Sequence, residues 1–432
     1  MIRLRKKRIR FAKSTDIQSQ KKEKVTKPQR EHLPHQRMRV PHQDRSCVLV
    51  STIVVLLVCQ VNAFTEFYPV CDQVTLLGFP CQTHIVTTAD GFQLSVNRIP
   101  PKMEGAYPVY LQHGLLDTSV TWVANAYANQ NLATILHNAG YDVWMSNARG
   151  NHYSMGNTQY SQSDPNYWLR IDMDWMAKYD LPAVIDYILA NVTNHTKLSY
   201  VGHSQGGMMG FAGFSTWNPE YAKKVDVFVA LAPACRVGQT TSFLIKLLAD
   251  LDVDAIFEIF GLKEFLANDW LLRQIASFCG DLGGICPDIL DIIVGDGNPA
   301  NINQSQIDTI LRYDPGGTSV NNMVHWAQEV RSGEFQAHDY GSVQNQVFYN
   351  STTAPKYNLS AMQGPPTFIF SGSNDALADP QDVEWIVASL PASVMKGSTV
   401  INGFAHMDFV WGLDAYSLLY PQILQLIEQY RS

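Results

Sequence analysis

The sequence lacks the short motifs that mark many metal-dependent and nucleotide-dependent enzymes. It has no H-E-x-x-H run, no C-x-x-C pair and no clustered acidic loop, which are common signatures of metal sites. It also has no glycine-rich loop of the dinucleotide-binding or Walker type. These absences exclude the enzyme classes that carry those motifs, and we expect chemistry that needs neither a cofactor nor a metal.

Basic residues are scarce outside the first 46 positions. Residues 1–46 hold 15 Lys and Arg against 4 Asp and Glu, whereas the rest of the chain holds 17 against 35. The basic segment is rich in Gln, His and Lys and poor in aromatic residues, a composition typical of solvated, disordered chain. We therefore expect no nucleic-acid partner.

Long apolar runs are also scarce. The most apolar stretch, Cys47–Cys59, has 13 residues, which suits the core of a signal peptide and is short for a membrane span. The small residues Val61 and Ala63 fit a cleavage site after it, and a start at Met38 would give a signal peptide of ordinary length. We expect residues 1–63 to be a basic segment plus signal peptide, and the protein to be secreted or lysosomal or vacuolar. The alternative is a signal anchor formed by residues 47–59.

Cysteines and glycosylation sequons agree with a secretory route. Cys47 and Cys59 would leave with the signal peptide, so five cysteines remain. Pairing neighbours in sequence predicts two disulfides, Cys71 with Cys81 and Cys279 with Cys286, and leaves Cys235 as a buried thiol. N-x-S/T sequons occur at Asn191, Asn194, Asn303, Asn350 and Asn358.

The pattern of elements from residue 64 onward predicts an α/β fold. Short apolar runs alternate with helical segments, as in a mostly parallel central sheet flanked by helices. The segment 174–190 has apolar residues at helical spacing. Strands are predicted at 107–112, 141–145, 198–201, 225–231, 367–371 and near 398–401.

The alternation stops between residues 236 and 315. This segment has helical spacing with many apolar residues, so we expect a helical cap or lid inserted between two parts of the core, 64–235 and 316–432. The alternative is a helical excursion that only packs on the core. A cap would suit a water-insoluble substrate, which needs an apolar surface to dock on.

Residues 202–206 read GHSQG and fit the nucleophile elbow G-x-S-x-G of the α/β-hydrolase fold. A predicted strand precedes the motif and a helical run follows it, which is the context that the elbow requires. Glycines suit the sharp turn because a side chain there would clash with neighbouring backbone. Ser204 is therefore the predicted nucleophile.

A serine hydroxyl needs a base, and the base needs a carboxylate to orient it. In this fold the chain order is serine, acid, histidine. Asp375 and His406 each follow a predicted strand and complete the predicted triad. Asp379 and Asp408 are the competitors for the acid, and the remaining histidines considered are expected to be surface or packing residues: His195, His325 and His338.

The negative oxygen of a tetrahedral intermediate must be met by N–H donors. We expect these donors to be the backbone amides of Gln205, just after the nucleophile, and of Leu115, in the loop LQHGLLD after an early strand. His113 in the same loop is expected to hold the loop's shape by hydrogen bonds rather than to transfer protons.

Taken together, the chain resembles the acid lipase family, which includes gastric and lysosomal acid lipases. The resemblance runs from about residue 64 to the C-terminus and rests on stretches such as LQHGLLDTSVTWV, GYDVWMSNARGN, KYDLPAVIDYI, YVGHSQGG, GTSVNNMVHWAQEVRSGEFQAHDYG, NDALADPQDV and HMDFVWG. The family's triad falls on Ser204, Asp375 and His406, and its oxyanion positions on Leu115 and Gln205. Cys279 and Cys286 look like the family's cap disulfide.

The resemblance implies a hydrolase that cleaves triacylglycerols or sterol esters. We expect a monomer that acts at an emulsion or membrane surface and releases fatty acids through an acyl-enzyme. Two alternatives remain. The same machinery could transfer the acyl group to another alcohol, or the fold could serve as a catalytically silent lipid-binding protein.

Overall fold

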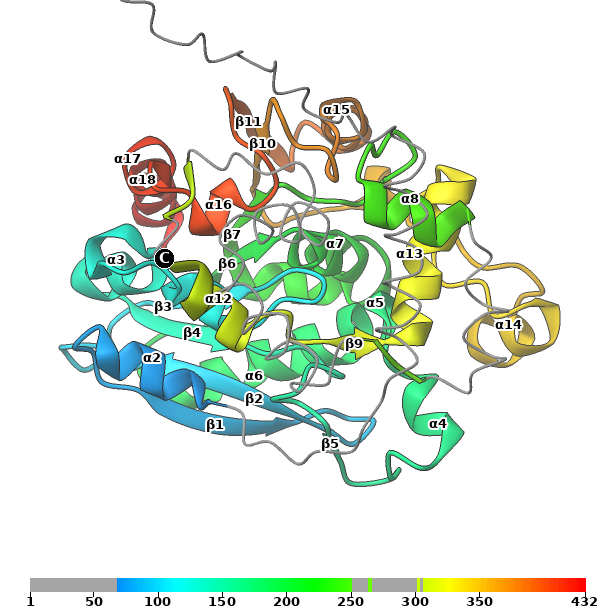
Figure 1. The fold of residues 1–432 in the computed structure, drawn as a ribbon, viewed down its shortest axis with the longest axis horizontal. Coiled ribbons are helices and arrows are strands. Elements are labelled where there is room, and N and C mark those ends of the chain that lie inside the picture. Colours follow the sequence, from blue (N-terminus) through cyan, green and yellow to red (C-terminus); the bar gives the residue numbers. More distant parts are fainter. Residues whose placement is uncertain (1–67, 251–262, 266–300, 304–305) are drawn as a thin grey trace, which may run out of the picture. The chain divides into compact units, whose positions relative to one another are not determined.

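The computed structural model of the protein describes residues 68–250, 263–265, 301–303 and 306–432 (Figure 1). The expected signal segment, the predicted pair Cys279 and Cys286, and most of the expected cap at 236–315 lie outside the described residues. Among the described residues, no helix combines the length and the apolar character that crossing a membrane requires.

A nine-stranded sheet forms the core, in the order β1-β2-β4-β3-β6-β7-β10-β11, with β5 beside β2. The strands from β4 to β11 pair in parallel, and β2 pairs antiparallel with β1, β4 and β5. The bounds are β1 (Gln82–Thr87), β2 (Phe92–Ile99), β3 (Pro108–Gln112), β4 (Asp142–Ser146), β5 (Gly156–Asn157), β6 (Leu198–His203), β7 (Val225–Leu231), β10 (Thr367–Gly372) and β11 (Met395–Ile401).

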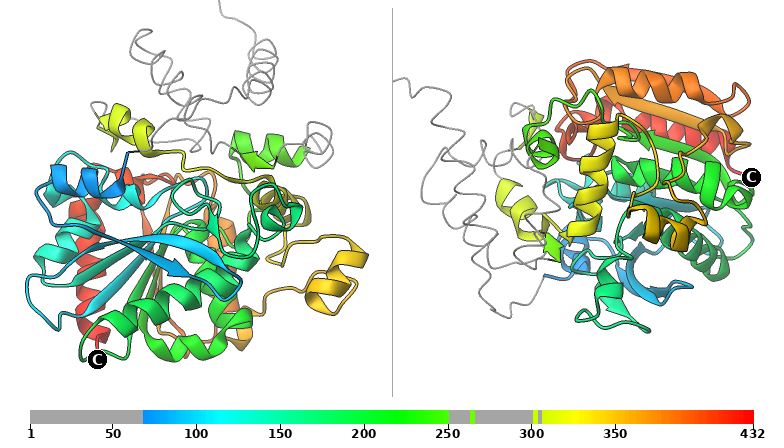
Figure 2. Two further views of the ribbon diagram at one scale, coloured as in Figure 1. Left: turned by 90° about the horizontal axis from the view of Figure 1, so that it is seen from below. Right: turned by 90° about the vertical axis from the view of Figure 1, so that its right-hand side faces the viewer.

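Helices cover both faces of this sheet. Figures 1 and 2 show α3 and α18 on one face and α6 and α7 on the other. The α-helical bounds are α2 (Val70–Leu76), α3 (Leu132–Asn138), α4 (Pro165–Trp168), α5 (Met173–Trp175), α6 (Leu181–Asn191), α7 (Gln205–Ala212), α8 (Phe243–Asp250), α12 (Ile307–Tyr313), α13 (Val320–Ser332), α14 (Ser342–Tyr349), α15 (Pro380–Ser389), α16 (Asp408–Trp411), α17 (Ala415–Leu418) and α18 (Tyr420–Tyr430).

Smaller elements complete the chain. A second, two-stranded sheet pairs β8 with β9. The remaining bounds are β8 (Glu264–Phe265), β9 (Thr318–Ser319), the 3₁₀ turns η1 (Ser119–Val123), η2 (Ala128–Gln130), η5 (Pro219–Lys224) and η8 (Leu359–Ala361), and the π-helical turns η3 (Met176–Asp180) and η4 (Gly213–Trp217).

The central strands explain why the sheet could be predicted. Every residue of β3, β4, β6 and β7 is buried, which matches the continuous apolar runs that parallel strands carry when helices cover both faces. Each predicted strand is present with bounds shifted by at most a few residues. The segment 174–190, predicted as one helix, is divided into α5, the π-helical turn η3 and α6.

Two cysteine predictions lie within the described residues. Cys71 and Cys81 form a disulfide between α2 and the start of β1, and Cys235 is a buried free thiol. Of the five sequon asparagines, Asn303 is half-buried and the others are exposed: Asn191, Asn194, Asn350 and Asn358.

Candidate active site

The turn around Ser204 is sharply bent. Ser204 follows β6, has a φ of 53° and precedes α7, so its backbone occupies a conformation that residues with a Cβ rarely adopt. A Cβ on Gly202 would lie 2.5 Å from the carbonyl oxygen of Gly206, and one on Gly206 would lie 2.4 Å from that of Gln112. The spacing of the motif is therefore a steric requirement of this turn.

Three predicted residues meet at this turn from distant parts of the chain. The Ser204 Oγ lies 2.8 Å from His406 Nε2, and His406 Nδ1 lies 2.9 Å from Asp375 Oδ2. Asp375 follows β10 and His406 follows β11, so all three sit beyond the carboxyl ends of parallel strands, where ligands bind in sheets of this kind. All three side chains are buried.

Backbone donors fix the acid. The amides of Leu377 and Ala378 donate to Asp375 Oδ1 at 2.9 and 2.8 Å. Since Asp375 Oδ2 faces the histidine, the carboxylate can fix the ring with a proton on Nδ1 and a lone pair on Nε2. That tautomer is the one that can accept a proton from Ser204.

The two competing carboxylates have other partners. Asp379 Oδ1 accepts from the amide of Gln381 at 2.8 Å and caps the start of α15. Asp408 Oδ2 accepts from the Ala405 amide at 2.7 Å, and burial raises the pKa of Asp408 to about 6. Asp408 therefore holds the backbone just before His406, and its other oxygen accepts from Asn301 Nδ2 at 3.0 Å.

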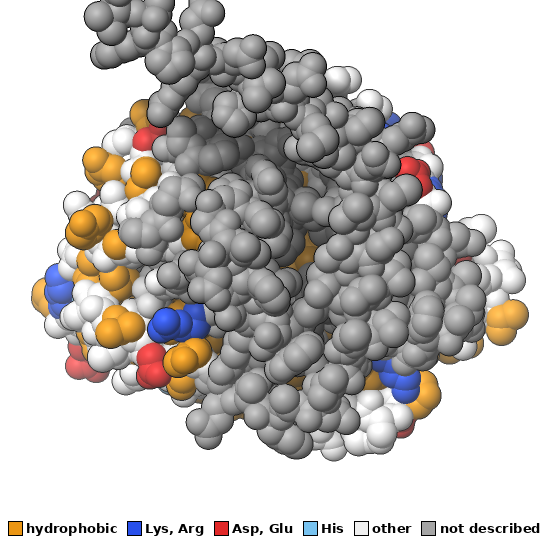
Figure 3. Space-filling view, viewed as in Figure 1, with side chains coloured by type: hydrophobic (Ala, Val, Ile, Leu, Met, Phe, Trp, Pro, Cys, Tyr) orange, Lys and Arg blue, Asp and Glu red, His pale blue; other side chains and the backbone are white. Residues whose placement is uncertain are grey.

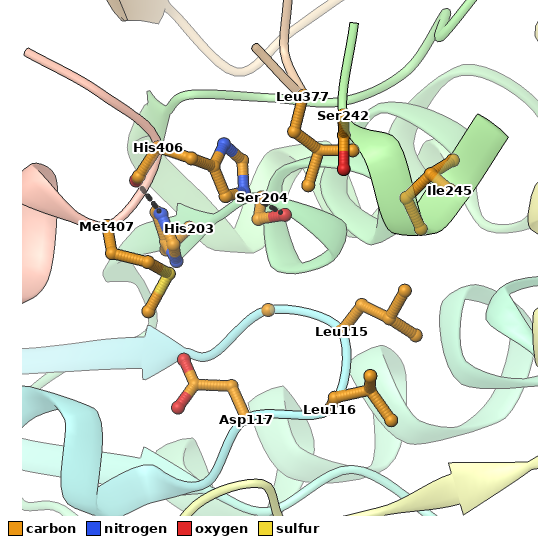
Figure 4. A pocket seen from close by; sticks show the side chains of 11 residues that line it. Leu115, Leu116, Asp117, His203, Ser204, Ser242, Ile245, Leu377, His406 and Met407 are labelled. Atoms are coloured by element: carbon orange, nitrogen blue, oxygen red, sulfur yellow. Dashed lines mark hydrogen bonds between the residues drawn. The ribbon is translucent and has the colours of Figure 1, made fainter. Parts of the chain in front are cut away.

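The loop after β3 lies opposite Ser204. Gly114 is so close that a Cβ there would lie 2.9 Å from the Ser204 Cβ. Leu115, the next residue, lines the same pocket as Ser204 (Figure 4). On the other side, Gln205 is the first residue of α7, and a first-turn amide has no acceptor within its own helix. Both predicted N–H groups thus belong to backbone that borders Ser204.

His113 and His203 support the site as neutral rings. The Ala148 amide donates to His113 Nε2 at 3.0 Å, so His113 Nδ1 carries the hydrogen and donates to the Gly114 carbonyl at 2.8 Å. Burial lowers the pKa of His113 to about 4 and that of His203 to about 3. His203 Nε2 lies 3.0 Å from the carbonyl oxygen of His406 and so helps to hold the backbone that carries the catalytic histidine candidate. The sequence reasoning did not single out His203.

The pocket over Ser204 is small and largely apolar. It includes Ser242 just before α8 and Ile245 within α8, both from the described start of the expected cap (Figure 4). Its lining is Gly114, Leu115, Leu116, Asp117, His203, Ser204, Ser242, Ile245, Leu377, His406 and Met407.

The other histidines considered lie away from Ser204 and its pocket. His195 Nε2 lies 2.9 Å from the Gly105 carbonyl oxygen. His325 and His338 stack on each other in a buried cluster with Asp172 and Asp174.

This cluster is the one group of described residues with the composition of a metal site, since atoms of Asp172, Asp174 and His325 lie within 4.8 Å of one another. The carboxylate of Asp172, however, already accepts hydrogen bonds from several donors: Trp175, Asn321, His338 and Tyr340. Three of these donors converge on Asp172 Oδ2 and join the start of α5 to α13 and to the segment before α14. Asp174 Oδ1 and His325 Nδ1 have no hydrogen-bond partner among the described residues.

Asp117, two residues after Leu115, lies against a second buried carboxyl group. Its buried carboxyl group neighbours that of Asp314, and Gly316 donates its N–H to the Leu116 carbonyl at 2.6 Å. Burial raises the pKa of Asp117 to about 7, and burial together with the charge of Asp117 raises that of Asp314 well above its usual range. The pair therefore retains a proton at acid pH. It also connects the loop after β3, which carries Leu115, to the segment after α12.

This pair predicts a pH dependence of stability. A carboxyl group whose folded pKa is raised above its unfolded value stabilises the fold fully below about pH 4, and this contribution is lost as the pH rises through about 7. In Asp314→Asn, the new side chain cannot ionise and can donate to Asp117. Between pH 5 and 8 the free energy of unfolding should fall in both proteins, and the fall in the variant should be smaller by at least about 1 kcal/mol. Urea unfolding at several pH values measures this. Exposed Asp186→Asn is the control, and a variant as pH-sensitive as the wild type would contradict the pairing.

The chain matches two family descriptions. Residues 70–126 match a partial α/β-hydrolase lipase region, and residues 107–251 match the α/β hydrolase fold. The solved structure of DcsB in complex with its substrate analogue aligns with a TM-score of 0.50 at 13% identity, over 81% of this chain and 100% of that one. This structural likeness concerns the fold alone.

Three human proteins are similar over most of their length. Gastric triacylglycerol lipase is 41% identical over 369 residues, covering 83% of this chain and 90% of that protein. Lysosomal acid lipase/cholesteryl ester hydrolase is 41% identical over 372 residues, covering 84% and 91%. Lipase member K is 40% identical over 363 residues, covering 82% and 89%.

Proposed function

The chain belongs to the acid lipase family of the α/β-hydrolase fold and is a carboxylic ester hydrolase that acts on lipid esters; we propose that Ser204, His406 and Asp375 are its catalytic triad. The observation that carries the proposal is the chain of short contacts from Ser204 Oγ to His406 Nε2 and from His406 Nδ1 to Asp375, at 2.8 and 2.9 Å. These contacts lie at the floor of an apolar pocket.

The first half-reaction forms the acyl-enzyme. The Ser204 oxygen attacks the ester carbonyl carbon while His406 Nε2 takes the hydroxyl proton, and the carbonyl oxygen becomes an oxyanion. The N–H groups of Leu115 and Gln205 donate to that oxyanion. As the tetrahedral intermediate collapses, the bond to the alcohol oxygen breaks, and His406 gives its proton to the departing alcohol.

The second half-reaction releases the fatty acid. Water takes the place of the alcohol, loses a proton to His406 and attacks the acyl carbon. Collapse breaks the bond to Ser204, whose oxygen recovers the proton from His406. Asp375 stabilises the imidazolium that forms twice in the cycle.

The proposed substrates are triacylglycerols and sterol esters presented at a lipid surface. The names of two relatives, gastric triacylglycerol lipase and lysosomal acid lipase/cholesteryl ester hydrolase, cover both classes. Leu115, Ile245 and Leu377 give the pocket apolar walls that suit an acyl chain. Figure 3 shows hydrophobic side chains scattered among polar, basic and acidic ones on the described surface at the left.

We also infer that the protein is secreted or resides in the lysosomal or vacuolar lumen. The disulfide between Cys71 and Cys81 needs an oxidising compartment to form and persist. The exposed sequon asparagines are accessible to glycosylation, which occurs on the same route. The expected signal peptide supports the same route.

The test of the substrate proposal compares lipid surfaces with soluble esters. We expect the purified protein to hydrolyse emulsified triolein and cholesteryl oleate, with Ser204→Ala as the blank and assays from pH 4 to 9. Product analysis with added cholesterol as a competing alcohol separates hydrolysis from acyl transfer. Activity confined to soluble p-nitrophenyl butyrate would overturn the lipid half of the proposal and leave the triad standing.

A further inference from the structure

The side chain of Gln205 is held by two donors from α13. Its Oε1 accepts a hydrogen bond from the indole Nε1 of Trp326 at 2.7 Å and one from Asn322 Nδ2 at 3.0 Å. All three side chains are buried. The two donors stand four residues apart, so they project from the same face of the helix.

The orientation of this side-chain amide is fixed on both ends. Because two N–H donors point at one atom of the Gln205 amide, that atom is the oxygen, and its Nε2 then faces the Met176 sulfur at 3.3 Å. Asn322 is fixed in turn, since its Oδ1 accepts from the Met173 amide at 3.1 Å.

The helix that carries the donors is itself anchored. Ser319 caps α13 by accepting from the Asn322 amide at 2.9 Å, and its hydroxyl donates to the Ile171 carbonyl. Asn322 and Trp326, which we call the clamp on Gln205, therefore belong to a helix whose start is hydrogen-bonded to the segment before α5. Both side chains are buried.

We propose that Asn322 and Trp326 are positioning residues that hold the backbone N–H of Gln205 in line with the oxyanion. The proposal rests on the function proposed above for that N–H. Gln205 is the first residue of α7, and only the strained Ser204 separates it from β6. The hydrogen bonds from Asn322 and Trp326 restrain its side chain as well, which preorganises its backbone N–H before charge develops.

The central test replaces the indole donor and keeps the ring. Trp326→Phe should lower kcat for p-nitrophenyl butyrate about tenfold while KM changes less than about twofold, because only a transition-state contact is weakened. The affinity for an alkylboronic acid, which forms a tetrahedral anion on the serine, should fall by a similar factor. Trp144→Phe is the matched control, since Trp144 is equally buried and its Nε1 has no hydrogen-bond partner.

A merely structural role predicts a different result. In that case Trp326→Phe would lower the melting temperature but leave kcat and boronic acid affinity no lower than in Trp144→Phe, and the proposal would be overturned.

Variants of Gln205 test the same contact from its other end. Gln205→Met removes the acceptor and should lower kcat as Trp326→Phe does, with KM changed less than about twofold. Adding Trp326→Phe to Gln205→Met should cause no further loss, because both changes remove one bond. Fully multiplicative losses would overturn the proposed contact, as would a wild-type kcat in Gln205→Met. If Trp326→Phe does not fold, kcat and boronic acid affinity of Gln205→Met, compared with Trp144→Phe, decide alone. Failure of the triad itself is seen separately, as activity in Ser204→Ala.

Discussion

Ser204→Ala should lower the hydrolysis of both triolein emulsions and p-nitrophenyl butyrate by about 10⁴- to 10⁶-fold. The substitution removes the atom that forms the acyl-enzyme, so no covalent intermediate can form. The residual rate would come from the two oxyanion donors and from substrate binding. Initial rates with titration of the released fatty acid measure the loss, and mass spectrometry after a phosphonate ester should show labelling of the wild type only.

The matched control is Ser215→Ala. Ser215 is also a buried serine, but it lies in η4 and its hydroxyl contacts Thr216. This variant should keep wild-type activity, and both variants should unfold at nearly the wild-type denaturant concentration. A Ser204→Ala protein that retained a tenth of the wild-type rate would require another nucleophile.

Arg149→Met should destabilise the fold by about 3–5 kcal/mol. The guanidinium is fully buried, contacts Asp180 Oδ1 and Asp90 Oδ2 at 2.6 Å each, and lies 4.2 Å from the centre of the Phe92 ring. Removing this charge leaves both carboxylates without their cationic partner, and each keeps only one hydrogen bond among the described residues, from Thr88 Oγ1 to Asp90 and from the backbone N–H of position 149 to Asp180. Burial already raises the pKa of Asp180 to about 6 with the arginine present, so an unpaired Asp180 would be strongly unfavourable.

Guanidinium unfolding measures this loss. The control is Lys224→Met, whose partner Asp186 is about half exposed and whose ion pair should contribute less than about 1 kcal/mol. Adding Asp180→Asn to Arg149→Met should restore part of the stability, because it removes one uncompensated charge. Equal losses for Arg149→Met and Lys224→Met would mean that the buried ion pairs do not stabilise the fold.

Much of the fold could be predicted because the central strands are continuous apolar runs. The prediction of an α/β-hydrolase fold with a mostly parallel sheet is confirmed. The hairpin of β1 and β2 was missed. In β1 only Val86 is buried and the other residues are exposed or half-buried, so this edge strand lacks the apolar run that marked the others.

Some residues of the candidate site were predictable from the sequence and others were not. Ser204 lies in a local motif, and Asp375 and His406 each follow a predictable strand, so their meeting point follows from topology. Their catalytic roles stay a prediction until the variants are measured. The donors to Gln205 are 117 and 121 residues away in sequence, and no spacing rule connects them to the elbow. The pairing of Asp117 with Asp314 was invisible for the same reason.

The order of strands has a consequence for how the chain is made. β10 and β11 add to the sheet at the free side of β7, after the long segment 232–366 has been synthesised. At ordinary rates of translation, β10 is synthesised roughly ten seconds or more after β7. During that time a strand that is wholly buried in the finished protein presents an unpaired edge, which is a template for aggregation. His406 is synthesised later still, so the nascent chain is prone to aggregation before its active site is complete. The yield of folded protein therefore depends on what covers the β7 edge during synthesis.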